Sequence, residues 1–317
     1  MSEIPNLQVI QEAHDRITPF IHRTPILTSQ SINKLTGAEI YFKCENFQKV
    51  GAFKARGGLN AVLSLNKEDS IKGVATHSSG NHAQAIALAA SMAEIPAYIV
   101  MPSNAPEVKK AAVKGYGAEI TECEPTLKAR ETNVERIVSE KGSNMIHPYN
   151  DYRIVAGQAT AAKELIEDVN LTLDSLLTPV GGGGLLSGSA LSAHYLSPET
   201  RVIGTEPEGA DDAYQSFKSG TLIPQLKPNT IADGLLTSLG ELNFEIIKKH
   251  VDDILLANDE EIINAMRLIW ERMKIIIEPS CAVPLAALMR SPDRFQGMKV
   301  GIILTGGNVD LAKLPFT

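Results

Sequence analysis

One lysine in the sequence has surroundings that suit a nucleophile. Lys54 follows Phe53 in the segment 45–58, where few carboxylates lie close by in sequence. Burial without a partner lowers the pKa of a lysine, and the neutral amine can then attack a carbonyl group. The alternative is a solvated lysine at a helix start, which spacing alone favours, because lysine is almost never buried unpaired.

A run of four glycines forms a second chemical feature. Gly181, Gly182, Gly183 and Gly184 follow an apolar run and precede a helical pattern. Bare backbone N–H groups at a helix start make a cradle for phosphate. A tight turn is the alternative, but two glycines would suffice for it. The spacing matches neither the dinucleotide fingerprint nor the P-loop, so it gives no support to NAD or ATP chemistry.

Two further turns carry small polar residues. Residues 77–82 read His-Ser-Ser-Gly-Asn-His, and residues 305–308 read Thr-Gly-Gly-Asn. The first turn offers hydroxyl and N–H groups to an anion, although Ser and Asn are equally good helix caps. Both turns follow predicted strands, and open parallel sheets bind ligands at the carboxyl ends of their strands. The three turns are therefore expected to surround one pocket.

The elements that must position these turns alternate between short β-rich runs and longer helical runs. This alternation predicts an α/β fold with parallel strands. The strands are expected at 39–44, 73–76, 97–101, 118–122, 175–180, 202–205, 253–256 and 300–304. The helices are expected at 7–17, 53–65, 81–92, 105–113, 126–140, 156–169, 185–195, 259–273 and 281–289.

Composition narrows the class of protein. The chain has 317 residues, of which 44% are apolar, and its net charge is −7. A negative chain argues against general nucleic-acid binding, and no apolar run reaches the length of a membrane span. The N-terminus lacks a signal-peptide pattern. Cys44, Cys123 and Cys281 are odd in number and far apart, which favours a reducing cytoplasm and three buried thiols.

Taken together, the motifs resemble those of the fold-type II pyridoxal-phosphate enzymes, and within them serine racemase and its dehydratase relatives. The likeness rests on residues 45–57 around Lys54, on residues 78–82, on the tetraglycine run and on residues 306–308. These motifs occur in order between Thr24 and Leu311. The resemblance implies two open, twisted, mostly parallel sheets flanked by helices. It also implies a small domain, 63–151, inserted into a large domain made of 1–62 and 152–317.

The resemblance also implies roles for individual residues. Lys54 carries pyridoxal 5'-phosphate as a Schiff base, and Phe53 packs against its ring. Residues 181–184 hold the phosphate, Asn81 hydrogen-bonds the ring hydroxyl, and Thr305 faces the ring nitrogen. The substrate carboxylate lies among Ser78, Ser79, Asn81 and His82, with Arg130 and Thr237 nearby.

The implied activity is interconversion of L- and D-serine, together with conversion of serine or threonine to a 2-oxo acid and ammonia. Inversion needs proton transfer on both faces of Cα, so Lys54 is assigned one face and Ser79 the other. Two rivals remain open: a threo-3-hydroxyaspartate dehydratase and a catabolic threonine dehydratase. A second carboxylate on the substrate needs a further cation, which the sequence does not identify. A non-catalytic sensor would have no use for Lys54.

A metal site and regulation complete the expectations. Glu206, the backbone of Ala210 and Asp212 match the racemase pattern that binds Mg²⁺, Ca²⁺ or Mn²⁺, and oxygen ligands suit such ions. The alternative is a solvated acidic loop. ATP stays open as an activator because Gln84, Tyr116, Lys274 and Asn308 match nucleotide-contacting positions, whereas Tyr149 departs from the animal racemases. The expected assembly is a cytoplasmic homodimer.

Overall fold

A computed structural model describes residues 3–316 and contains two separate β-sheets flanked by helices. The six-stranded sheet has the order β1-β2-β10-β7-β8-β9, and the four-stranded sheet has the order β5-β4-β3-β6. Every pairing is parallel except that of β1 with β2. The predicted α/β fold with two mostly parallel sheets is therefore confirmed.

The element bounds follow the predicted alternation. The strands are β1 Ile26–Leu27, β2 Glu39–Cys44, β3 Val74–His77, β4 Ala97–Pro102, β5 Glu119–Cys123, β6 Asn144–Met145, β7 Ser175–Pro179, β8 Arg201–Pro207, β9 Asp253–Ala257 and β10 Lys299–Leu304. The helices are α1 Leu7–Ile17, α2 Gln30–Thr36, α3 Lys54–Leu63, α4 Lys67–Lys72, α5 Asn81–Met92, α6 Glu107–Gly115, α7 Leu127–Lys141, α8 Tyr152–Val169, α9 Gly184–Leu196, α10 Asp212–Ser219, α11 Glu241–His250, α12 Asp259–Met273 and α13 Pro279–Arg290.

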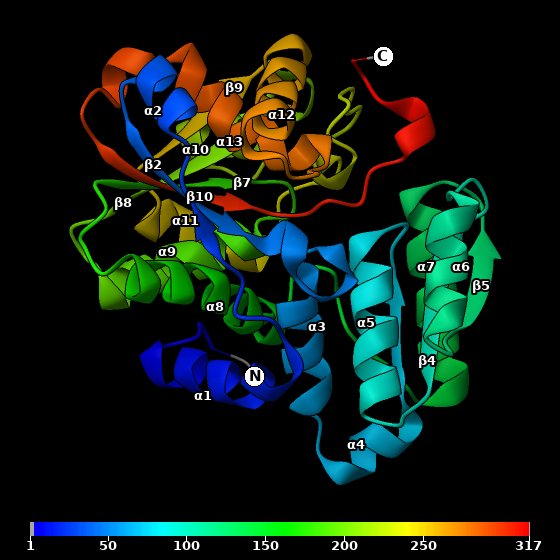
Figure 1. Ribbon diagram of the computed structural model, residues 1–317. Coiled ribbons are helices and arrows are strands. Elements are labelled where there is room, and N and C mark those ends of the chain that lie inside the picture. Colours follow the sequence, from blue (N-terminus) through cyan, green and yellow to red (C-terminus); the bar gives the residue numbers. More distant parts are fainter. Residues whose placement is uncertain (1–2, 317) are drawn as a thin grey trace.

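The larger sheet is built from both ends of the chain and is buried on both faces. On β10, Ile302 and Leu304 pack toward α12 and α13, whereas Ile303 packs toward α8 and α9. Side chains alternate along a strand, so a strand covered on both sides must be apolar throughout. This explains the continuous apolar run of β10. Figure 1 shows α12 and α13 on one side of this sheet and α8 and α9 on the other.

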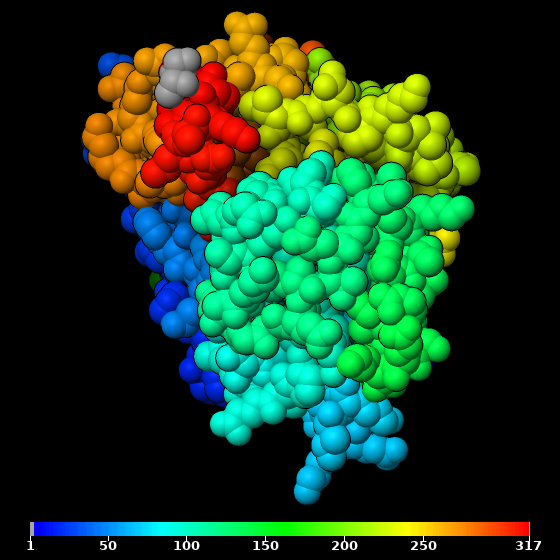
Figure 2. All heavy atoms as spheres, turned by 90° about the vertical axis from the view of Figure 1, so that its right-hand side faces the viewer, coloured from blue at the N-terminus to red at the C-terminus, as the bar shows by residue number. Residues whose placement is uncertain are grey.

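The smaller sheet forms a distinct part of the molecule together with α5, α6 and α7. Ile99 and Met101 on β4 face the cluster that includes α3 and α5, while Val100 faces α7. Figure 2 looks directly onto this part, which lies below the C-terminal segment. All four of its strands and the helices α4 to α7 fall within residues 67–145. We keep 63–151 as the proposed extent of the small domain.

A glycine contact and a buried ion network fix the helix that begins with Lys54. α3 crosses α8 so closely that a Cβ on Gly157 would lie 2.6 Å from the Cα of Gly57. Arg56, two residues after Lys54, is fully buried between Glu45 and Glu164. These contacts tie α3 to the segment after β2 and to α8. Within residues 3–316, no helix combines the length and apolarity required to cross a bilayer.

Candidate active site

The three polar turns predicted from the sequence converge on one cavity of about 160 Å³. β3 leads into residues 78–80 and α5, β7 leads into the glycine run and α9, and β10 leads into Thr305. All the predicted cofactor and substrate residues line this cavity: Phe53, Lys54, Ser78, Ser79, Asn81, His82, Arg130, Gly181, Gly182, Gly183, Gly184, Thr237 and Thr305. Their roles remain proposals, but the structure brings them together.

Lys54 is the nucleophile that this cavity offers. Its Nζ donates a hydrogen bond to the carbonyl oxygen of Pro148 at 3.0 Å and lies 5.2 Å from the centroid of the Phe53 ring. Burial lowers the pKa of Lys54 to about 8, and the charge of Glu278 opposes this shift only in part. The lowered pKa raises the fraction of neutral amine near pH 7, which makes the lysine a better nucleophile.

The start of α3 is fixed by the end of β10. The Phe53 N–H donates to the carbonyl oxygen of Thr305 at 3.0 Å, and Ala52 forms a bridge with Gly306. Lys54 is therefore held next to the third polar turn, although 251 positions separate Lys54 from Thr305 in the chain. A contact between such distant segments cannot be predicted from local sequence patterns.

The glycine run forms a cradle that side chains would fill. A Cβ on Gly182 would lie 2.1 Å from Cγ of Tyr149, and Gly183 has φ +91°, a conformation that favours glycine. Asn243 donates from Nδ2 to the Gly182 carbonyl oxygen at 2.7 Å and so fixes the loop from behind. The N-terminus of α9, a helix of 13 residues, follows at once. Its free N–H groups and positive helix end make this loop an anion site.

A second helix start opens into the same cavity. Ser79 is exposed in the loop before α5, and the Gly80 N–H donates to Ser78 Oγ at 3.3 Å. Asn81 donates from Nδ2 to Glu278 Oε1 at 3.0 Å and accepts from Asn308 Nδ2 at 2.9 Å. The cavity therefore presents two helix starts whose N–H groups suit an anion, one on each part of the molecule.

The histidines at this end of the small sheet are neutral at pH 7. Burial lowers the pKa of His77 and of His147 to about 4 and holds that of His82 well below its ordinary value. His82 Nε2 forms a hydrogen bond with Thr76 Oγ1 at 3.2 Å. These rings therefore contribute hydrogen bonds and packing to this end of the small sheet, and no positive charge.

Several residues that line the cavity were not predicted as site residues: His77, Lys109, Leu127, Tyr149, Asp233, Glu278 and Ser280. Burial raises the pKa of Glu278 to about 7, and the charge of Asp233 adds to this. Glu278 is the N-cap residue of α13 and precedes Pro279, which is the one local signal that marks its position. Lys109 and Asp233 have no such signal.

The predicted metal residues lie outside the cavity, around the turn after β8: Glu206 is near the end of β8, Ala210 is in the turn and Asp212 begins α10. Glu206, Ala210 and Asp212 are buried, with relative exposures of 0%, 0% and 3%. Glu206 accepts hydrogen bonds from the N–H groups of Ala213 and Tyr214, and Asp212 Oδ2 accepts from Leu239 N. Asp212 Oδ1 is buried without a well-aligned hydrogen bond. Two buried carboxylates of like charge fit a cation.

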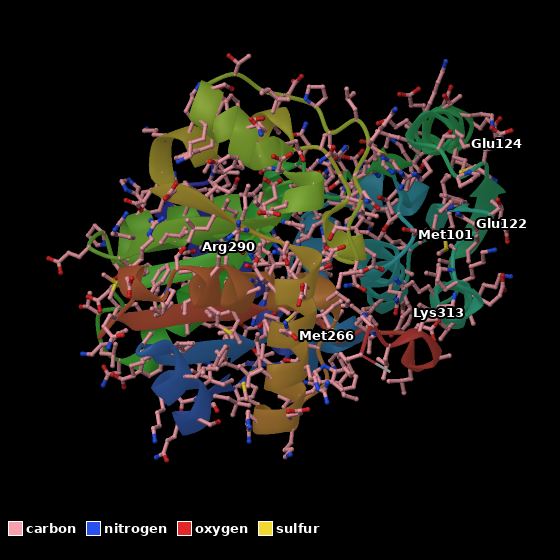
Figure 3. The ribbon with its side chains drawn as sticks, turned by 90° about the horizontal axis from the view of Figure 1, so that it is seen from above. Met101, Glu122, Glu124, Met266, Arg290 and Lys313 are labelled. Carbon is pink, nitrogen blue, oxygen red and sulfur yellow. The ribbon has the colours of Figure 1, made fainter. Side chains whose placement is uncertain are left out.

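The other two carboxylates of this segment bond elsewhere, and Asp211 accepts a hydrogen bond from Gln215 at 2.9 Å. Residues 3–316 contain no group of three His, Cys, Asp or Glu side chains suited to a metal, so a cation here would also need backbone and water oxygens. Glu208, in this turn, pairs with Arg290 at 2.5 Å, and Figure 3 shows Arg290 well away from the small part.

Comparison with known proteins identifies the family. A family model described as pyridoxal-phosphate dependent enzyme matches residues 17–306. The chain belongs to this family. The fold, the resemblance and the prediction of an enzyme that uses pyridoxal phosphate are therefore confirmed.

Relatives whose activities are named align with almost the whole chain. The chain is 53% identical to a β-hydroxyaspartate dehydratase of Paracoccus denitrificans (strain Pd 1222), over 99% of each chain. The crystal structure of serine racemase from Dictyostelium discoideum has a TM-score of 0.92 at 51% identity, covering 96% of this chain and 99% of that one. Maize serine racemase has a TM-score of 0.95 at 43% identity, covering 98% and 95%.

The cavity fits the cofactor of this family. Its aldehyde reacts with a neutral amine, and the pKa of about 8 gives Lys54 a larger neutral fraction near pH 7 than an ordinary lysine has. Its phosphate requires N–H groups without side chains in the way, and the loop 181–184 supplies them. Thr305 is 3% exposed and lines the cavity, where it would offer a hydroxyl, not a carboxylate, to the ring nitrogen of the cofactor.

Proposed function

We propose that the protein interconverts L- and D-serine and also converts serine and threonine to a 2-oxo acid and ammonia. The observation that carries this proposal is the placement of Lys54 and Ser79 on one cavity from two different parts of the chain. Lys54 begins α3, whereas Ser79 precedes α5 at the edge of the small sheet. Inversion at Cα needs a proton donor and acceptor on each face, and these two residues supply such a pair.

The side chains divide the work of binding. The loop 181–184 and the start of α9 bind the cofactor phosphate, and Phe53 lies against the ring. Residues 78–82 bind the substrate carboxylate through hydroxyl and N–H groups at the start of α5. Arg130 and Thr237 complete the substrate side of the cavity.

Proton transfer at Cα is the central step. When bound, pyridoxal phosphate withdraws electrons from the substrate and so weakens the Cα–H bond. Lys54 Nζ takes or returns the proton on one face, and Ser79 Oγ does so on the other. The Thr305 hydroxyl cannot keep the ring nitrogen protonated as a carboxylate would. For elimination, serine loses its Cα proton and its hydroxyl as water, and hydrolysis then gives pyruvate and ammonia.

The second candidate is a threo-3-hydroxyaspartate dehydratase, and the Paracoccus denitrificans relative at 53% identity favours it. A catabolic threonine dehydratase is the third. Initial rates of the holoenzyme on L-serine, L-threonine and L-threo-3-hydroxyaspartate, with D-serine formation followed by chiral chromatography, distinguish the three. Inversion of serine supports the first proposal. A rate dominated by hydroxyaspartate without inversion replaces it with the second.

We further propose that Glu206, the Ala210 carbonyl and Asp212 bind Mg²⁺, or Ca²⁺ or Mn²⁺ in its place. The support is the burial of two carboxylates with like charge and the poorly satisfied Asp212 Oδ1. The site lies apart from the cavity, so the ion stabilises the turn after β8 and takes no part in proton transfer.

The resemblance also supports proposals on ATP activation, on the assembly and on the location of the protein. ATP would act as an activator through Gln84, Tyr116, Lys274 and Asn308, and Asn308 reaches the active site through its hydrogen bond to Asn81. The assembly would be a homodimer, which sedimentation velocity measures directly. The three cysteines are free and buried, which supports a cytoplasmic location.

A further inference from the structure

An ion pair made from two distant segments lies at the cavity. Lys109, on α6, donates from Nζ to Asp233 Oδ2 at 3.1 Å, and both residues line the cavity. α6 packs with the small sheet, whereas Asp233 lies in a short 3₁₀ turn, Asp233–Leu235, that packs against α13 of the large part. The proposed function gives neither side chain a role.

The Lys109 ammonium lies beside the loop proposed to bind the substrate carboxylate. A Cβ on Gly80 would be 3.5 Å from Lys109 Nζ. The Lys109 side chain is only 19% exposed, so its charge is held at the cavity and not in bulk water. A group on the carbon next to Cα would therefore be within reach of this ammonium when the α-carboxylate occupies residues 78–82.

Few other cations line this cavity. The described residues around it include three basic side chains, Lys54, Lys109 and Arg130, and two carboxylates, Asp233 and Glu278. The histidines are neutral at pH 7 for the reasons given above. Lys54 is committed to the cofactor. Arg130 donates from Nε to the carbonyl oxygen of Thr126, the N-cap residue of its helix, at 3.4 Å. Because Arg130 also lines the cavity, it is the rival cation that the test below includes.

Asp233 is a replaceable partner. Its side chain is 55% exposed, and its carboxylate can turn into solvent when a stronger partner arrives. Exposed ion pairs contribute little to stability because water screens them and long side chains lose freedom. A substrate carboxylate that is already held in the cavity loses less conformational entropy when it pairs with Lys109, so it can replace Asp233.

We propose that Lys109 binds a second substrate carboxylate, on the β-carbon, and so extends the site from serine and threonine to dicarboxylic 3-hydroxyamino acids. The inference rests on the proposed function, because it assigns a substrate class to the same cavity. Serine and threonine have no second carboxylate and leave the ion pair between Lys109 and Asp233 intact. With L-threo-3-hydroxyaspartate, the β-carboxylate of the substrate replaces the Asp233 carboxylate as the partner of Lys109.

The test compares Lys109→Met with Lys114→Met, which removes an exposed lysine from the same helix. For the holoenzyme, Lys109→Met raises the KM for L-threo-3-hydroxyaspartate about tenfold or more, as expected for a lost hydrogen bond between charged groups. Its kcat on that substrate and its KM for L-serine change little. Lys114→Met changes neither the KM for L-threo-3-hydroxyaspartate nor the KM for L-serine. Asp233→Asn lowers the KM for hydroxyaspartate because Lys109 loses its competitor.

A binding measurement separates this inference from the proposed function. L-Aspartate and L-alanine, added as competitors, are followed by the change in cofactor absorbance. Lys109→Met weakens binding of L-aspartate and not of L-alanine. If the enzyme turns over none of the substrates, the proposed function fails, while this binding result still decides the role of Lys109. Equal weakening of both ligands, or a selective loss in Arg130→Met instead, would overturn the inference.

Discussion

The buried network behind the lysine helix predicts a large cost for one conservative substitution, Glu164→Gln. Glu164, on α8, accepts two hydrogen bonds from Arg56, each 2.8 Å long, and its Oε2 lies 2.7 Å from Lys43 Nζ. The three side chains are at most 1% exposed. The glutamine keeps the shape of the side chain and removes its charge, which leaves Arg56 and Lys43 with Glu45 as the buried carboxylate.

The expected loss follows from the pKa of Glu164. Burial alone would raise this pKa, but the hydrogen bonds and charges of Arg56 and Lys43 outweigh burial and lower it from 4.5 to about 2. Such a lowering corresponds to about 3 kcal/mol of stabilisation at pH 7. Removing one member of a buried ion pair costs roughly 3–5 kcal/mol in other proteins. The pKa lowering and the cost of breaking buried ion pairs therefore both give a loss in the free energy of unfolding of about 3 kcal/mol.

Urea denaturation at a series of pH values measures this loss. Because the pKa is lower in the folded state, the stabilisation is complete above pH 4.5 and is lost as the pH falls toward 2. The wild type therefore loses stability over this range, and Glu164→Gln lacks that part of the loss. Glu271→Gln, which breaks an exposed pair with Arg267, is the matched control and should change little. A loss below about 1 kcal/mol for Glu164→Gln at pH 7 would refute the reasoning.

Three other predictions concern the proton donor, the phosphate loop and the metal. Ser79→Ala should reduce serine inversion by a factor of about 100 or more, with elimination much less affected; equal losses in the two assays would exclude Ser79 as the second-face residue. Gly182→Ala should lose bound cofactor, measured by absorbance after gel filtration, because the methyl group would meet the Tyr149 ring. Gly115→Ala, whose Cβ meets nothing within 4 Å, is its control, and retention of cofactor by both variants would contradict the cradle. EDTA should lower the melting temperature and Mg²⁺ should restore it; an unchanged melting temperature, together with no Mg²⁺ in the purified protein, would count against the site at Glu206 and Asp212.

Much of the fold was predictable because strands and turns are local signals. The strand 39–44 and the helices 81–92 and 259–273 were predicted with the bounds that the structure has. Apolar runs buried on both faces and clear caps, such as the capping box of Asn258 and Glu261, carry this information. α8 begins at Tyr152, four residues before the predicted start, because Asp151 caps it through its side chain.

The elements that the sequence did not predict are short or close to polar segments. α2 and α4 have 7 and 6 residues, too few for a clear helical period. α10 and α11 have 8 and 10 residues and are stabilised by packing against α9, β9 and each other. Tertiary packing decides the structure of such segments more than local propensity does.

The candidate site likewise contains residues that the sequence predicts and residues that it does not. The turns that follow β3, β7 and β10 were predictable because parallel strands present their carboxyl ends together. Lys109 was not predictable, because it is followed by Lys110 on the same helix and only the tertiary structure separates them. Lys109 reaches the cavity and Asp233, whereas Lys110 turns to Glu122 on the outer side of the small part (Figure 3).

The account depends most on Lys54 as the residue that holds pyridoxal phosphate. Borohydride reduction of the holoenzyme, followed by proteolysis and mass spectrometry of the peptides, tests this directly. The account predicts a pyridoxyl phosphate group on the peptide that contains Lys54, and loss of that adduct in Lys54→Ala. An adduct on another lysine, or none on folded protein that retains the cofactor, would contradict the account.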